Sequence, residues 1–187
     1  KNGTFSIHKV ALTVTAEDKS VTYGDEAPEY TVKIEGFRNG DDESDLGGTL
    51  GFYRDYEQYS DVGEYDIKPY GLEADNYVFF YNFGTLTVSP KEITVTIKNA
   101  ASVYGDELSE PEATDDGIVN GDTNVYSIST TATSTSNVGK YEITGTALDS
   151  NYEVTFVNGE YEITKREITI AAEDKTAVVN TALPTYT

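Results

Sequence analysis

The sequence contains no cysteine, methionine or tryptophan, and its single histidine is His8. Without cysteine, no disulfide can brace the fold, and no thiolate can bind zinc or attack a substrate. A serine triad or an imidazole metal centre would need histidine partners that the chain lacks. We therefore expect no enzyme activity, no metal site and no cofactor, and we interpret His8 as an exposed linker residue. No apolar run has the length of a membrane span.

Basic residues are also scarce, because 13 lysines and arginines stand against 33 aspartates and glutamates, for a net charge of −20. Such a surface repels phosphate backbones and anionic lipid headgroups. We therefore expect no nucleic-acid partner and no membrane insertion of this segment. The same charge keeps a repetitive chain soluble and discourages wrong association, so we expect a monomer.

The most regular feature of the sequence is an internal repeat. Segments Leu12–Ala16, Ile93–Ile97 and Ile168–Ala172 align without a gap, at offsets of 81 and 75 residues. These offsets are the size of a small domain, and tandem copies point to an array. We predict the terminal strand of a preceding repeat in residues 1–9, complete repeats in residues 10–90 and 91–165, and the truncated start of a third in residues 166–187. The chain is thus expected to be a section of a longer array.

Each repeat shows the alternation of a β-strand. Ile93, Val95 and Ile97 fall on one side and Thr94 and Thr96 on the other. Turn residues separate the further strands, which are predicted at residues 30–37, 50–56, 65–69, 77–83, 126–133, 141–146 and 152–157, with strands of the third copy at 167–172 and 183–187. The third copy's strands would be ordered only with a borrowed partner.

One short helix at most is expected in each repeat. Acidic residues and a following glycine pair favour it at Asp41–Leu46, and more weakly at Gly121–Val125. The order of elements predicts a mostly β protein built of tandem small β-grasp-like modules. Immunoglobulin-like β-sandwich modules are the alternative.

A Tyr-Gly-Asp turn stands at matching positions, Tyr23–Asp25 and Tyr104–Asp106, and the third copy has Asn180 in place of the glycine. Glycine and asparagine both tolerate the left-handed backbone region. We therefore predict a positive φ at Gly24, Gly105 and Asn180, with the tyrosine packed beneath the turn.

Further short motifs recur in the same order in both repeats: Gly36–Asp41, Val62–Ile67, Asn76-Tyr77 and Gly84–Val88, then Val119–Asp122, Val138–Ile143, Asn151-Tyr152 and Gly159–Ile163. Together with the Tyr-Gly-Asp turn, this series resembles the MBG domain of the YGX type over nearly the whole chain. It departs at Ile118, where the first repeat has an aromatic residue, and at Val179-Asn180, which replaces Tyr-Gly.

The resemblance implies tandem modules of large bacterial surface proteins and adhesins, with no catalytic activity and no ligand carried over. We therefore expect a non-catalytic structural or display repeat, a stalk, on the outside of a bacterial cell. The connections Ser89–Lys91 and Thr164–Arg166 are very short, and Pro90 stiffens the first. Neighbouring repeats are thus expected to be near-coaxial.

The two repeats differ on one face of the strand at residues 77–83. Val78 and Phe80 point away from the predicted core, where the second repeat has Glu153 and Thr155. An outward apolar pair indicates a contact surface that belongs to the first repeat alone. A local cover by the tyrosines of residues 53–59 is the alternative.

The competing function is an adhesive binding module. The candidate contact residues are Val78, Phe80, Tyr53, Tyr56 and Tyr59, which would engage a host protein or a glycan. Two stabilising devices stay open as hypotheses. Calcium could bind at a junction through Glu17, Asp18, Glu173 and Asp174, and an isopeptide bond could join Lys68, Lys91 or Lys140 to Asn76 or Asn151.

Overall fold

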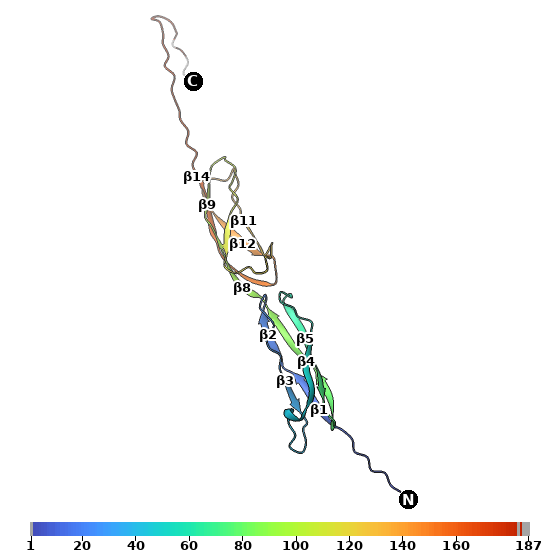
Figure 1. Cartoon of the computed structure of the whole chain (residues 1–187). Coiled ribbons are helices and arrows are strands. Elements are labelled where there is room, and N and C mark those ends of the chain that lie inside the picture. The colour runs from blue at the N-terminus through green and yellow to red at the C-terminus, as the bar shows by residue number, and fades with distance from the viewer. Residues whose placement is uncertain (1, 183, 185–187) are drawn as a thin grey trace.

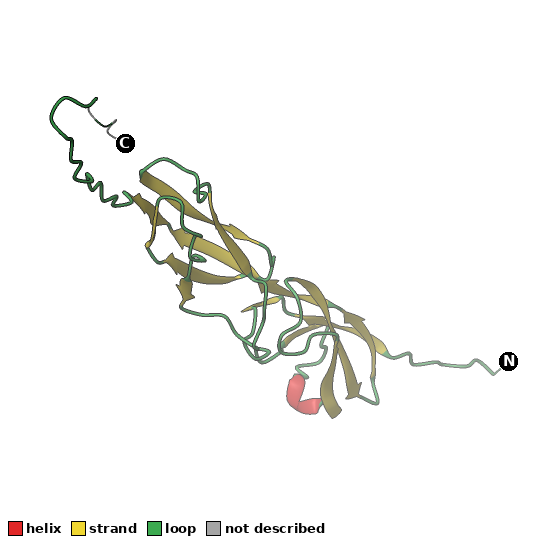
Figure 2. Ribbon diagram, turned by 90° about the horizontal axis from the view of Figure 1, so that it is seen from above, coloured by secondary structure: helices red, strands yellow, loops and turns green. Residues whose placement is uncertain are grey.

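The computed structural model describes residues 2–182 and residue 184. The chain forms two β-rich bodies that lie end to end, with the N- and C-terminal segments leaving at opposite ends (Figure 1). The view from above shows the same elongated arrangement (Figure 2). We call the bodies module 1 (residues 10–89) and module 2 (residues 91–164).

Module 1 contains β1 (Val10–Ala16), β2 (Lys19–Thr22), β3 (Val32–Glu35), the 3-10 helix η1 (Glu43–Asp45), β4 (Gly47–Arg54), β5 (Gly63–Glu73), β6 (Tyr77–Asn82) and β7 (Gly84–Ser89). Module 2 contains β8 (Lys91–Ile97), β9 (Ala100–Val103), β10 (Ala113–Asp115), β11 (Tyr126–Thr130), β12 (Gly139–Ala147), β13 (Tyr152–Val157) and β14 (Gly159–Thr164). The predicted mostly β fold of small modules is confirmed.

Both modules have the same topology. In module 1 a three-stranded sheet has the order β3-β1-β6 and a four-stranded sheet the order β2-β7-β5-β4. Module 2 repeats this with β10-β8-β13 and β11-β12-β14-β9. β1 pairs in parallel with β6, and β2 in parallel with β7. The first and last segments of a module therefore run side by side through both sheets, as in a β-grasp sheet.

The alternating residues fill the core. Leu12 and Val14 of β1 are fully buried, as is Val95 of β8, and Ile93 and Ile97 are 3 and 4% exposed. Burial of each such side chain stabilises the fold by about 1.5–3 kcal/mol. Alternation places the intervening threonines on the outer face of the same sheet.

The single helical element among the described residues is shorter than predicted. In η1 the Asp42 carboxylate accepts a hydrogen bond from the Ser44 N–H at 2.8 Å, and the Asp45 carboxylate accepts one from the Asp42 N–H at 2.9 Å. This capping box closes one turn and no more. The weaker prediction at residues 121–125 is wrong, because Gly121 and Asn124 have φ values of 71° and 60°, outside the right-handed helical region.

The turn prediction is confirmed: φ is 88° at Gly24, 86° at Gly105 and 66° at Asn180. Outside the modules, residues 2–9 and 165–182 form no strand, including the predicted strand at 167–172. The predicted strand at 183–187 lies outside the described residues, Pro184 apart.

One glycine in each module lets the last strand begin directly against the bend between the first two strands. A Cβ at Gly84 would lie 2.8 Å from the carbonyl oxygen of Ala16, and one at Gly159 would lie 2.8 Å from that of Lys98. Both neighbours are backbone atoms, which cannot turn aside as a side chain can. Only glycine lets β7 or β14 start against the bend between the module's first two strands.

We expect Gly159→Ala to lower the free energy of unfolding of module 2 by about 1–3 kcal/mol, because the backbone must shift to admit the methyl group. Urea unfolding followed by circular dichroism measures this. Gly139→Ala is the matched control, since a Cβ there meets no atom within 4 Å. Equal stability of the two variants would contradict the requirement for glycine at this position.

Candidate functional site

The modules meet at a joint built around Tyr23. The residue directly follows β2, and its N–H donates to the carbonyl of Ser89 at 2.9 Å, at the end of β7. The turn closes with a 3.0 Å hydrogen bond from the Asp25 N–H to the Thr22 carbonyl. Strand pairing thus fixes the turn at the end of module 1 that faces module 2. The Tyr23 side chain is only 4% exposed.

Module 2 receives this ring with an aspartate and a second tyrosine. The hydroxyls of Tyr23 and Tyr152 both donate to Oδ2 of Asp122, at 2.9 and 2.7 Å. The two rings meet edge to face, with centroids 5.4 Å apart and an interplanar angle of 71°. The Tyr152 hydroxyl also accepts from the Val119 N–H at 3.1 Å. One carboxylate therefore ties a loop of each module together.

A second contact forms beside the first. Nδ2 of Asn151 donates to Oδ1 of Asp61 at 2.9 Å, and the Val62 N–H donates to Oδ1 of Asn151 at 2.8 Å. Asn151 is 8% exposed, so both ends of its amide are satisfied within the joint. Removal of this side chain would leave a backbone N–H without its partner.

The turn glycine allows the modules to approach closely. A Cβ at Gly24 would lie 2.9 Å from Cγ2 of Val119, so a larger residue would push the modules apart. On the far side of the turn, the rings of Tyr59 and Tyr23 meet edge to face at 6.4 Å. The positive φ predicted from the sequence thus also serves the contact with module 2.

Burial and the shared aspartate control the ionisation of the joint. Burial, followed by the hydrogen bond to Asp122, raises the pKa of Tyr152 to about 12 from an ordinary value of 10.0. The same two causes raise the pKa of Tyr23 further. Both hydroxyls therefore keep their protons at neutral pH and remain hydrogen-bond donors to the carboxylate.

The prediction that a tyrosine packs beneath each Tyr-Gly turn is right at Tyr23 and wrong at Tyr104. Tyr104 is 45% exposed. The physical reason is that Tyr23 is covered by Tyr152 of the next module, whereas no described residue plays that part for Tyr104. The cover comes from a neighbouring module and not from the turn itself.

Val78 and Phe80 lie on the outer face of the sheet β3-β1-β6, beside Ala11 and Thr13 of β1. Their side chains are 43 and 57% exposed. The alternative that local tyrosines cover them is therefore wrong.

The three tyrosines proposed as contact residues do not gather at this face. Tyr53 belongs to β4 and stacks on Tyr70 with centroids 4.1 Å apart. Tyr56 is 3% exposed and donates from its hydroxyl to the Asp25 carbonyl at 2.6 Å, so it is a core residue that supports the joint turn. Tyr59 lies at the joint. Tyr56 is therefore withdrawn from the candidate contact surface.

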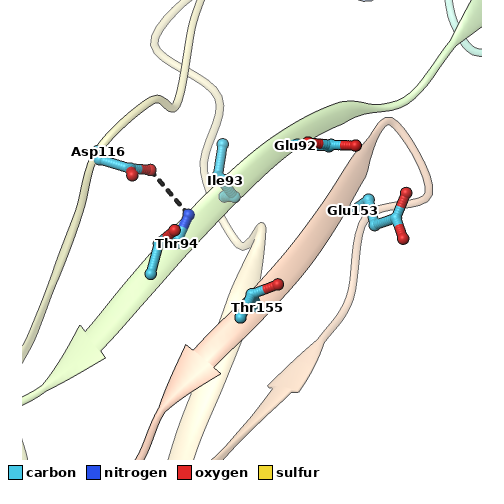
Figure 3. A pocket seen from close by; sticks show the side chains of 6 residues that line it. All are labelled: Glu92, Ile93, Thr94, Asp116, Glu153 and Thr155. Atoms are coloured by element: carbon cyan, nitrogen blue, oxygen red, sulfur yellow. Dashed lines mark hydrogen bonds between the residues drawn. The ribbon is translucent and has the colours of Figure 1, made fainter.

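The corresponding face of module 2 is polar and slightly hollowed. Figure 3 shows Glu92 and Thr94 of β8 beside Glu153 and Thr155 of β13, with Asp116 across from Thr94. The Asp116 carboxylate accepts from the Thr94 N–H at 2.7 Å. In the described part of the chain, no three histidine, aspartate or glutamate side chains are grouped so as to hold a metal ion.

Several of the groups named for crosslinking have other partners. Lys68 forms ion pairs with Asp55 and Asp66, at 3.1 and 3.2 Å, and Lys140 pairs with Glu160. Asn151 is engaged in the joint. His8 is exposed, as expected.

Glu17 and Asp18, two of the four carboxylates named for calcium, are likewise engaged. Glu17 accepts from the Thr31 hydroxyl and pairs with Lys19 at 3.3 Å. Asp18 accepts from the Thr85 N–H at 2.8 Å, close to the bend between β1 and β2. Both carboxylates thus have a structural role within module 1.

Two modules of one topology, with the Tyr23 turn of one held by Asp122 of the next, define a tandem-repeat protein. Residues 12–87 and again residues 93–162 match the MBG domain (YGX type), so the chain belongs to this family, and the resemblance in the sequence is confirmed. Membership indicates a tandem-repeat module of a surface protein. Among curated proteins, no sequence matches the chain. The described residues contain no helix of the length and apolarity needed to cross a membrane.

The pH dependence of stability tests the ionisation of the joint. The pKa of Tyr152 is higher in the folded than in the unfolded state, so its protonated hydroxyl contributes to stability. This contribution is complete below about pH 10 and is lost as the pH rises towards 12. Tyr23→Phe removes one of the two ionisations, so we expect a shallower fall in melting temperature between pH 9 and pH 11.5, as set by that window. Because the hydroxyl is missing, the Tyr23→Phe chain also loses the hydrogen bond to Asp122, which lowers its free energy of unfolding at pH 7 by about 1.5 kcal/mol.

Thermal melting across this pH range makes the measurement. Tyr104→Phe is the matched control, because this tyrosine is exposed and stands at the equivalent turn. Parallel pH profiles for Tyr23→Phe and the unsubstituted chain would contradict the assignment.

Proposed function

We propose that the chain is a non-catalytic stalk segment, which holds other parts of an extracellular bacterial adhesin away from the cell surface. The observation that carries this proposal is the buried joint, in which Tyr23 of one module is held by Asp122 and Tyr152 of the next. A spacer needs resistance to bending more than it needs a cleft, and the joint supplies that resistance.

The connection between the modules supports a stiff stalk. β7 ends at Ser89 and β8 begins at Lys91, so Pro90 is the only linking residue. The Lys91 N–H donates to the Asn151 carbonyl at 2.9 Å, directly beside the link. A one-residue connection and two side-chain contacts restrain both hinge and twist between the modules.

The composition supports an extracellular location and a passive role. A chain without cysteine is unaffected by the redox conditions outside a cell. A net charge of −20 keeps an extended array soluble and opposes collapse of one module onto another. The polar groups of the joint are engaged with each other, which favours a structural role over a catalytic one.

Small-angle X-ray scattering tests the stalk. We expect the unsubstituted chain to give the distance distribution of a narrow rod, because the joint fixes the angle between modules. Tyr23→Ala combined with Asn151→Ala should broaden the distribution and shorten the mean end-to-end distance, since both contacts are removed.

Tyr104→Ala combined with Asn76→Ala is the matched control. It changes the equivalent residues at the outer ends of the two modules and leaves the joint intact, so the rod should persist. A compact or freely hinged unsubstituted chain would contradict the stalk.

The second candidate function is adhesion through module 1 itself. It is favoured by the exposed pair Val78 and Phe80, which stands where module 2 has Glu153 and Thr155 on the same outer face. An apolar pair on a solvent-facing strand lowers solubility, so contact with a partner would explain its presence. The occupant would be a host protein or a glycan.

An immobilised array of glycans and extracellular-matrix proteins tests this candidate. We expect any specific signal to be lost in Val78→Asp/Phe80→Asp and kept in Thr155→Asp, which adds a charge at the equivalent face of module 2. Circular dichroism confirms folding of both variants. No signal from the unsubstituted chain, or a signal that survives in Val78→Asp/Phe80→Asp, would reject adhesion through this pair.

A further inference from the structure

The joint has a donor half, the Tyr-Gly turn, and an acceptor half, the aspartate and tyrosine that receive it. The acceptor half occurs twice in the chain. At the N-terminal end of module 1 the Tyr77 hydroxyl donates to Oδ2 of Asp41 at 2.7 Å and accepts from the Arg38 N–H at 3.0 Å. In module 2 the Tyr152 hydroxyl makes the same two bonds, at 2.7 and 3.1 Å, with Asp122 and the Val119 N–H. The two acceptors therefore share their geometry as well as their sequence.

The two acceptors differ in what covers them. In module 2 the aspartate and tyrosine are covered by Tyr23 of module 1. In module 1 the corresponding place is an open recess, lined by Arg38, Asn39, Asp41, Asp75, Asn76 and Tyr77 together with residues 7–10. Phe37 packs edge to face on Tyr77 at 5.9 Å and His8 is in the lining, but among the described residues no tyrosine hydroxyl besides that of Tyr77 bonds to Asp41.

The donor half also occurs twice. The Tyr104 N–H donates to the Thr164 carbonyl at 2.9 Å, as the Tyr23 N–H does to Ser89. The neighbouring loop is repeated as well, because Ser136 bonds to Thr133 in the same pattern as Ser60 bonds to Glu57. The turn at the far end of module 2 is therefore preformed.

This second donor end is exposed, and Arg166 flanks its turn: the guanidinium donates to the Tyr104 carbonyl at 2.9 Å and pairs with Asp106. Tyr104 is 45% exposed, and Val138, the counterpart of Val62 in the joint, is 47% exposed. Beside this ion pair, the exposed tyrosine and valine at the end of module 2 form the kind of small apolar surface that a partner covers.

We propose that the recess at Asp41 and Tyr77 binds the tyrosine of a Tyr-Gly turn from another MBG module, and that Tyr104 supplies such a turn, so that a second copy of this chain docks head to tail. This deepens the proposed stalk, on which it rests. The incoming hydroxyl would donate to the Asp41 carboxylate, which already accepts from Tyr77. Donor and acceptor ends differ, so the contact leads to an open linear array and not to a closed dimer.

The side chains at the outer ends of the two modules are compatible with this contact. Asn76 corresponds to Asn151, and Asn137 corresponds to Asp61, so the amide-to-oxygen hydrogen bond of the joint can form between two neutral side chains. Arg38 replaces Val119 at the mouth of the recess and would lie near the Arg166–Asp106 ion pair that flanks the Gly105 turn. Without a covalent link the contact between two acidic chains is weak, and salt should strengthen it by screening.

Disulfide trapping detects such a weak contact. The chain has no cysteine, so every introduced thiol is unique. In the joint, a Cβ at Gly24 would lie 3.7 Å from Cβ of Val119, which fits the Cβ separation of about 3.5–4.5 Å in a disulfide. The equivalent pair between two chains is Gly105→Cys on one and Arg38→Cys on the other.

We expect an equimolar mixture of the Gly105→Cys and Arg38→Cys chains to form the mixed disulfide severalfold faster than a mixture of Thr155→Cys and Arg38→Cys. Thr155 is exposed on the outer face of module 2, away from the tip. Added Tyr104→Ala in the Gly105→Cys chain should abolish the difference. Equal rates for the two mixtures, or no effect of Tyr104→Ala, would overturn the docking.

The internal pair Gly24→Cys with Val119→Cys separates this inference from the stalk. A disulfide within one chain, without the mixed disulfide between chains, would leave the joint standing and reject only the docking. Absence of the internal disulfide from a folded chain would count against the joint itself.

A second measurement avoids substitution of the turn glycine. Unlabelled chain is added to ¹⁵N-labelled chain at raised salt, and the backbone amide shifts are followed. Shifts confined to Arg38, Asp41, Tyr77 and Gly105 support docking. With unlabelled Tyr104→Ala, loss of the shifts at Arg38, Asp41 and Tyr77 but not at Gly105 assigns them to the incoming tyrosine. No shifts at these residues, or shifts spread over both outer sheet faces, would reject it.

Discussion

A single carboxylate oxygen that accepts from two tyrosine hydroxyls is the interaction on which the extended form of this chain depends. Asp122 brings a negative charge to the contact between two acidic modules. Without the hydrogen bonds from the two hydroxyls, repulsion would separate the modules and open a hinge. Hydrogen bonds from two hydroxyls offset the cost of placing that charge beside buried rings. Burial and the carboxylate also raise the pKa of both tyrosines, because the site favours a donor hydroxyl over a phenolate.

The internal topology of a module makes this joint repeatable. β1 and β2 run alongside β6 and β7, so the Tyr-Gly turn after β2 emerges beside the end of β7, where the chain leaves for the next module. The Asn-Tyr pair stands at the opposite end, at the start of β6 or β13. Every copy with this topology therefore carries a donor at one end and an acceptor at the other, whatever its outer faces carry.

Much of the module could be predicted from the sequence, whereas the joint could not. Alternation at Ile93, Val95 and Ile97 is a local signal, and a positive φ at Gly24 follows from a local backbone requirement. The joint depends on the hydrogen-bonded pairs Tyr23–Asp122 and Asp61–Asn151, which are 99 and 90 residues apart in the sequence and meet only after both modules have formed. Periodicity carries no information on which exposed loop of one module will face which loop of the next.

Tyr56 and Tyr104 were misassigned from the sequence because their burial depends on contacts that local patterns do not show. Tyr56 lies in a tyrosine-rich loop that looks exposed in the sequence, but its hydroxyl finds the Asp25 carbonyl and its ring supports the turn. Tyr104 was expected to be buried by analogy with Tyr23, yet burial of Tyr23 comes from module 2. The recurrence of Tyr-Gly and Asn-Tyr in both repeats was visible in the sequence, but only the fold places these motifs at opposite ends of a module.

Separation of the joint from the outer sheet faces explains how the two modules can differ so much in surface chemistry. Val78 and Phe80 of module 1 correspond to Glu153 and Thr155 of module 2, and neither pair contributes to the core or to the joint. Substitution on these faces alters what an array presents without altering how its modules stack. The opposite holds at the module ends, where a change at Tyr23 or Asn151 alters the angle between modules and with it the position of everything beyond. In such a chain, geometry is set at the ends of the modules and surface character along their sides.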